Sequence, residues 1–145
     1  MDKAVLRELS LTEGLLNQLE ADDLDHPFGY RCQPAYYWRS SPIAGRGIVA
    51  LWECGTVISY FNQNNRRFEQ CSLENIDEVW CSYSSLQGLL AELFIDVYED
   101  EVEIDILIEY AKLFGFLSIE RLLIEAQTPP EDYVRWRQGF ARSCG

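Results

Sequence analysis

Apolar residues recur at helical spacing near the N-terminus of this 145-residue chain, with acidic and amide residues between them. The run Ser10-Leu11-Thr12-Glu13 is a capping-box pattern, in which the serine would cap a helix and the glutamate would reach back to it. A break near Ser10 would divide the region into two short helices. We therefore predict helix over residues 2–22, with an apolar stripe at Leu6, Leu9, Leu16 and Leu19.

The pattern changes in the middle of the chain to short apolar, β-branched and aromatic runs. These runs occupy residues 47–52, 56–61 and 66–71, and Cys54-Gly55 forms a plausible turn between the first two. Asn62-Gln63-Asn64-Asn65 predicts a hairpin turn because Asn tolerates the left-handed conformation that tight turns need. We predict an antiparallel meander, with an edge strand at residues 35–39.

Helical spacing returns after residue 84. Apolar stripes predict helices over residues 86–97, 104–114 and 119–126, with Ser84 or Ser85 capping the first and Gly115 ending the second. A final helix is expected to start in the run Thr128-Pro129-Pro130-Glu131. Strands followed by helices predict an α+β fold, in which an antiparallel sheet of about three to five strands in the middle of the chain has helices packed around it. The length predicts a single domain, residues 1–145.

The charge of the chain is strongly acidic, with 24 Asp and Glu against 12 Lys and Arg and a net charge of −12. Sequence-independent binding to nucleic acid or to an anionic membrane needs basic surface, so this balance argues against both. The acids are unevenly placed. Residues 68–111 carry twelve acids and no base, whereas residues 26–67 carry five bases and one acid.

The densest acidic run contains Glu99, Asp100, Glu101, Glu103 and Asp105, between two predicted helices. One interpretation is a solvated connection whose acids favour the N-terminus of the following helix. The other is an acidic docking surface for a basic protein partner, which would speed association and select partners. Under the second interpretation Glu99, Asp100, Glu101 and Glu103 are candidate partner-binding residues.

Aromatic residues cluster around the predicted strands, and most of them are expected in the core. Trp, Tyr and Arg at an exposed sheet face are typical anchors of protein contacts. Arg66 and Arg67 on the hairpin beside Tyr60 would suit such a patch.

Chemistry of the enzymatic kind has little support in the sequence. His26 is the single histidine, and the five cysteines contain no C-x-x-C pair, so neither a metal site nor a Cys-His nucleophile is indicated. Reduced thiols that behave as small apolar residues are expected. Neither a G-x-S-x-G elbow nor a glycine-rich phosphate loop occurs. Asp96, between Ile95 and Val97, is the best candidate for a carboxylate of perturbed pKa, but an exposed acid on an amphipathic helix is the simpler interpretation.

Membrane and export signals are also missing from the pattern. The most apolar region, residues 86–113, is interrupted by acids, and the N-terminal residues carry acids where a signal peptide would be basic. A cytoplasmic protein is expected.

Residues 47–115 resemble the SUKH superfamily, which takes its name from the yeast cell-wall-assembly regulator and includes many bacterial immunity proteins. The resemblance rests on an apolar strand leading into Trp52-Glu53-Cys54-Gly55, then Thr56-Val57-Ile58-Ser59-Tyr60-Phe61, a polar turn, a third strand, and Ser72-Leu73-Glu74 and Ser84-Ser85-Leu86 before a Leu-rich helix. It implies a non-enzymatic α+β domain that binds other proteins, often a secreted nuclease or deaminase toxin. The family-like positions are Trp52, Glu53, Gly55, Tyr60 and Ser72, of which Trp52, Glu53 and Tyr60 are candidate partner-binding residues.

The sequence therefore favours a protein-binding domain without a cofactor, acting in an immunity or regulatory role through an acidic surface. The alternative is a small enzyme or ligand-binding domain with a site between the sheet and the helices.

Overall fold

A four-stranded antiparallel sheet occupies the middle of the chain, in a computed structural model that describes residues 1–128 and 130–145. Its strands are consecutive in sequence and in space: β1 (Ile48–Cys54), β2 (Val57–Asn62), β3 (Arg67–Ser72) and β4 (Asn75–Tyr83). The helices are α1 (Lys3–Glu8), α2 (Glu13–Ala21), α3 (Leu86–Glu99), α4 (Ile104–Phe114), α5 (Ile119–Gln127) and α6 (Tyr133–Cys144), and two 3₁₀ helices, η1 (Tyr37–Ser40) and η2 (Pro42–Gly45), precede β1. The predicted α+β class is confirmed.

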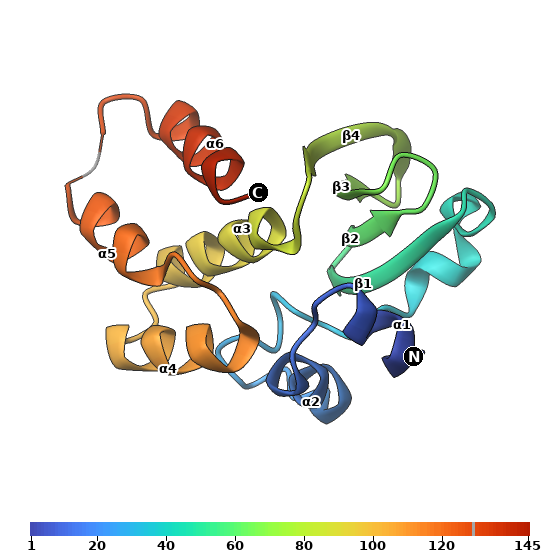
Figure 1. Ribbon diagram of the computed structural model, residues 1–145, viewed down its shortest axis with the longest axis horizontal. Helices are drawn as coiled ribbons and strands as arrows, with labels where there is room; N and C mark the ends of the chain where they lie inside the picture. The colour runs from blue at the N-terminus through green and yellow to red at the C-terminus, as the bar shows by residue number, and fades with distance from the viewer. Residues whose placement is uncertain (129) are drawn as a thin grey trace.

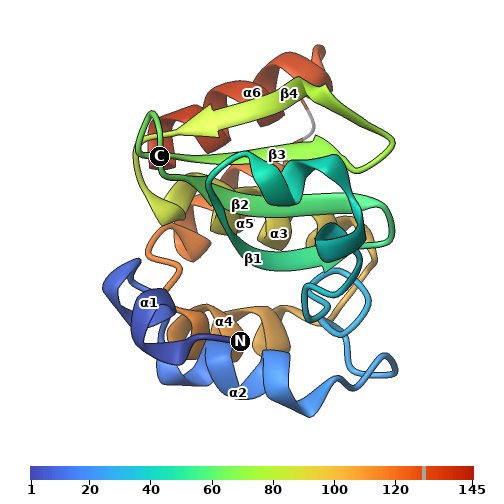
Figure 2. The same cartoon turned by 90° about the vertical axis from the view of Figure 1, so that its right-hand side faces the viewer.

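Helices lie on one face of this sheet, and the two 3₁₀ helices lie on the other (Figures 1 and 2). α3 crosses behind the strands and separates them from α4 and α5, while α6 lies beside α3 near β4. α2 packs against α4, close to the β1 edge. The helix-covered face therefore holds the main core.

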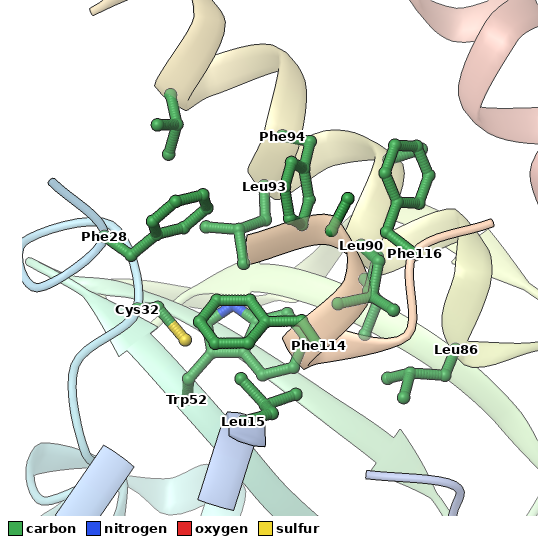
Figure 3. Packing of buried hydrophobic residues seen from close by; sticks show 14 of the residues in the cluster. Leu15, Phe28, Cys32, Trp52, Leu86, Leu90, Leu93, Phe94, Phe114 and Phe116 are labelled. Atoms are coloured by element: carbon green, nitrogen blue, oxygen red, sulfur yellow. The ribbon is translucent and has the colours of Figure 1, made fainter. Parts of the chain in front are cut away.

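The main core is built around α3. Trp52 of β1 lies among Phe94 of α3, Phe114 of α4 and Phe28 of the loop after α2, all at most 2% exposed (Figure 3). A smaller cluster on the opposite face joins η2 to the strands through Ile43, Ile58, Tyr60 and Cys71. Because the sheet is covered on both faces, its inner strands β2 and β3 are mostly buried.

The N-terminal helical region is divided, as one of the two sequence interpretations allowed. Ser10 has a left-handed conformation with φ of 76°, which ends α1 and starts a short connection. The predicted serine cap is wrong, because Thr12 is the N-cap of α2 and its Oγ1 accepts the N–H of Leu15 at 3.2 Å.

The predicted edge strand at residues 35–39 is also wrong. The backbone there curls into η1 because the N–H groups of Tyr36, Tyr37 and Trp38 all donate to the Glu53 carboxylate. β1 is therefore the outer strand on this side, with a single bridge from Gln33 to Glu53 beside it. The opposite outer strand is β4, which the sequence did not reveal. Its exposed residues include Asn75, Asp77 and Glu78, so an apolar alternation is absent.

The turns and later helices follow the sequence pattern closely. Gly55 turns the chain between β1 and β2 with φ of 59°, and Gly115 ends α4 with φ of 75°. The β2–β3 hairpin is present, but its left-handed residue is Arg66 rather than an asparagine. The last helix begins at Tyr133 with Asp132 as its cap, later than predicted from Thr128 to Glu131; Pro129 lies outside the described residues.

Candidate functional site

A cleft of about 560 Å³ lies between the helix-covered face of the sheet, α3 and α6. Its floor comes from alternate positions of neighbouring strands, because side chains on one face of a sheet are spaced two residues apart. The lining is about equally polar and apolar, and its polar side chains include Cys54, Ser59, Gln70 and Cys81 from the strands, and Glu92, Asp96 and Arg137 from the helices. Further lining residues are Arg31, Trp52, Val57, Trp80, Ser82, Tyr83, Leu93, Tyr133, Val134, Gln138 and Arg142.

The floor of the cleft is a hydrogen-bonded chain of neutral groups. The Gln70 amide donates to Ser59 Oγ at 2.9 Å and accepts from Cys81 Sγ at 3.6 Å. Burial raises the pKa of Cys81 to about 12, so this thiol is protonated at neutral pH. Because the thiolate is the nucleophilic form of cysteine, the floor is suited to hydrogen bonding rather than to covalent chemistry.

Arg137 organises the helical wall of the cleft. Its Nη2 lies 2.8 Å from Glu92 Oε2 and 2.7 Å from Asp96 Oδ1, and its Nη1 lies 3.4 Å from both carboxylate oxygens of Glu99. The three acids follow one another on successive turns of α3. Tyr83 adds its hydroxyl to Glu92 at 2.8 Å, and burial raises the pKa of that phenol.

Asp96 was the acid that the sequence singled out as a catalytic candidate. It is neither isolated in an apolar pocket nor fully exposed, since its side chain is 29% exposed and paired with Arg137. The arrangement therefore works as an ion-pair network that joins α6 to α3, and it lacks the two contrasting carboxylates of an acid–base pair.

The hairpin patch expected from the sequence is not assembled at the surface. Trp52 and Tyr60 are 2% and 3% exposed, and the Tyr60 hydroxyl donates to the buried Glu69 at 3.0 Å. Arg67 turns inward to Ser82, donating to its Oγ at 2.6 Å and its carbonyl at 2.9 Å. Arg66 alone of these four is exposed, with its guanidinium 5.6 Å from the centroid of Phe61.

Glu53, another predicted contact, is also internal, with 1% of its surface exposed. Its carboxylate accepts the N–H groups of Tyr36 and Tyr37 at 3.2 Å and of Trp38 at 2.9 Å. These N–H groups lie at the start of η1, where a helix leaves its donors unpaired. Glu53 therefore anchors the loop before β1 and does not face a partner.

The predicted acidic run divides into paired and unpaired members. Glu99 is held by Arg137 and Tyr133, and Asp100 forms a two-point ion pair with Arg31 at 2.8 Å for both bonds. Glu101 and Glu103 are exposed. Glu103 occupies the N-cap position of α4, but its side chain makes no capping hydrogen bond.

The loop after α2 lies against this acidic run, a relationship that the sequence did not predict. His26 hydrogen-bonds the Tyr110 hydroxyl through Nε2, and the Arg31–Asp100 pair holds the same loop to the end of α3. We call the exposed acids of the two segments the acidic pole: Asp22, Asp23, Asp25, Glu101, Glu103, Asp105 and Glu109. Within the described residues none of these carboxylates forms an ion pair.

Exposed apolar side chains lie within the acidic pole. Leu24, between Asp23 and Asp25, is 58% exposed, and Ile104, between Glu103 and Asp105, is 47% exposed. A polar rim around apolar side chains is one feature of protein contact surfaces. Acidic flanks on both segments were visible in the sequence, but nothing there indicated that they meet.

The remaining candidate chemistry is sparse. All five cysteines are free, and Cys32 and Cys71 are buried. Across residues 1–128 and 130–145, no three His, Cys, Asp or Glu side chains gather as a metal site requires. No described helix combines the length and the apolar character that crossing a membrane requires.

No family model, curated protein or solved structure matches the chain.

Proposed function

We propose that this protein acts by binding another protein whose surface is basic, and that the acidic pole is the contact surface. The observation that supports the proposal is that His26–Tyr110 and Arg31–Asp100 hold the loop after α2, which carries the acids of residues 22–25, to the acidic segment before and within α4. Each of the two segments also carries one exposed apolar side chain, Leu24 or Ile104. Unpaired carboxylates attract a basic partner over a distance of about one Debye length, and the apolar side chains add contact area after docking. An immunity or regulatory role, as the resemblance to the SUKH superfamily implies, belongs to this proposal.

The test compares two charge-reversal variants of equal charge change. The first, D25K/E101K/E103K, alters the acidic pole, and the second, E8K/E74K/E120K, alters exposed acids outside it. A basic partner captured by the wild-type protein should associate much more slowly with the first variant at low salt, and the difference should shrink as salt rises. Equal association rates for the two variants, or a partner without a basic surface, would contradict the proposal.

The cleft between the sheet, α3 and α6 supports a second candidate function, the binding of a small ligand. Its volume of about 560 Å³ lies within the range of small-molecule sites, and its floor offers the partly exposed amide of Gln70, which the buried Ser59 orients by a hydrogen bond. A ligand that binds only the folded state raises the unfolding midpoint. A thermal-shift screen of metabolites against the wild-type protein and S59A separates this candidate from the first, because charge reversal at the acidic pole would leave such a shift unchanged.

A further inference from the structure

A separate pocket of about 310 Å³ lies where α3, α5 and α6 meet. The last turns of α3 and α5 and the start of α6 come together at the side of the molecule away from the sheet (Figure 1). The lining combines aromatic and aliphatic side chains with one carboxylate: Ile95, Tyr98, Glu99, Ala126, Pro130, Tyr133 and Trp136. Glu99 is the one carboxylic acid among the seven lining residues, and no lysine or arginine is among them.

Hydrogen bonds from their polar groups fix two of the aromatic side chains that line this pocket. The Tyr133 hydroxyl donates to Glu99, and the Trp136 indole N–H donates to Glu125 Oε1 at 3.3 Å. The two rings lie 5.5 Å apart between centroids, at an interplanar angle of 41°. Tyr98 of α3 also packs against the main core. These contacts preorganise the rings, so an incoming ligand would not have to order them.

The carboxylate of this pocket is incompletely neutralised. One guanidinium, that of Arg137, serves Glu92, Asp96 and Glu99, and its contact with Glu99 is the longest of the three at 3.4 Å. Burial raises the pKa of Glu99 above its usual value despite the neighbouring arginine. A second cation beside Glu99 would therefore be stabilised by a charge that the protein leaves partly uncompensated.

We propose that this pocket binds an alkylated ammonium group, with the methyl groups against Tyr98, Tyr133 and Trp136 and the positive charge beside Glu99. Aromatic faces attract such cations through the ring quadrupole, and quaternary ammonium ions lose little hydration on entering an apolar site. A metal ion would need several oxygen ligands, which the seven lining residues do not supply. A neutral apolar group would gain nothing from the carboxylate.

Two kinds of ligand carry an alkylated ammonium group: a free quaternary ammonium compound and a methylated lysine on another protein. The inference does not rest on the acidic pole as a contact surface, because a free compound can fill the pocket without any protein partner. Failure of the proposed function would therefore leave this inference standing, and failure here would leave the proposed function untouched.

The experiment titrates the wild-type protein with choline and with dimethylbutanol, in which carbon replaces the ammonium nitrogen, while amide and indole N–H spectra are recorded. Choline is expected to shift the Trp136 indole signal and to bind on the order of tenfold more tightly than its neutral isostere. Equal binding of the two compounds, or no shift with choline, would overturn the proposal.

Two variants then test whether Glu99 belongs to the site, and a methylated peptide tests which kind of ligand the pocket prefers. E99Q keeps the size of the side chain and should weaken choline binding about tenfold, whereas the matched control E120Q, which removes an exposed helical acid outside the lining and outside the acidic pole, should not. Equal effects of the two variants would contradict a role for Glu99. A trimethyllysine peptide that binds more tightly than choline identifies a protein source, and the reverse order identifies a free compound.

Discussion

Arg137 Nη2 lies 2.7 Å from Asp96 Oδ1, and this contact joins the last helix of the chain to the helix that crosses the sheet. The guanidinium also reaches Glu92 at 2.8 Å, so two half-buried carboxylates depend on one cation. Removing one partner of such a network leaves uncompensated charge in a poorly solvated place. The association of α6 with α3 is thus electrostatic as well as apolar.

Replacing Arg137 with methionine should lower the free energy of unfolding by about 2–3 kcal/mol, because Glu92 and Asp96 lose their counter-ion. Urea unfolding measures the change. The control is R135M, which removes an exposed arginine from the same helix and should change stability by less than about 0.5 kcal/mol. Similar losses in the two variants would show that the network contributes nothing beyond surface charge.

The Glu53 carboxylate should be essential to the loop that contains η1. E53Q keeps the shape but replaces the carboxyl acceptor of three N–H groups with an amide, and should destabilise the protein by about 1–3 kcal/mol. Amide hydrogen exchange at Tyr36 to Trp38 should accelerate in parallel. E74Q, at an exposed position, is the control. Unchanged exchange at these amides would contradict the anchoring role.

Two glycines in helices should respond to alanine with opposite signs. A Cβ at Gly88 of α3 would overlap the ring of Tyr83, whereas a Cβ at Gly139 of α6 would meet nothing within 4 Å. G88A should destabilise by about 1–3 kcal/mol through overpacking, and G139A should stabilise by about 0.5–1 kcal/mol through helix propensity. Thermal unfolding of both variants checks the close approach of α3 to β4. If G88A stabilised the protein, the Gly88 position could not lie against the ring of Tyr83.

Glu99 and Asp100 are neighbours whose pKa values shift in opposite directions. Burial raises the pKa of Glu99, so its ionisation removes stability as pH rises through the folded-state value. The hydrogen-bonded Arg31 lowers the pKa of Asp100, so its ionisation adds stability that is lost as pH falls.

Relative to wild type, E99Q should therefore gain stability as pH rises from about 3 to 7, and D100N should lose it over the same interval. Urea unfolding across this interval measures the two slopes. The change for D100N should be small, because its ion pair is partly exposed and screened by solvent. If the stabilities of E99Q and D100N relative to wild type changed with pH in the same direction, the opposite pKa shifts of Glu99 and Asp100 would be contradicted.

Several elements could be predicted because their signals are local. The strands β1, β2 and β3 follow from β-branched and aromatic runs, and the ends of α4 follow from an apolar stripe and Gly115. β4 escaped prediction because an edge strand has one hydrogen-bonded neighbour and half-exposed faces, so Asp77 and Glu78 are tolerated there.

The residues of the candidate surface also divide into those that the sequence could place and those that it could not. Glu101 and Glu103 could be predicted as exposed acids from their place between two helical stripes. Trp52, Glu53 and Tyr60 were placed at a surface because residue type alone does not report burial. Arg137 was missed because its partners on α3 lie more than thirty residues away in sequence.

The sequence by itself determined the α+β class, the order of most elements and the concentration of acid in residues 68–111, since each depends on local periodicity or on composition. Only the tertiary structure decided which carboxylates are neutralised and which face solvent. Arg31 and Arg137 pair with acids across the fold, while residues 22–25 join the acidic pole. Side-chain pairing and burial depend on contacts between distant segments, and those contacts exist only after the chain has packed.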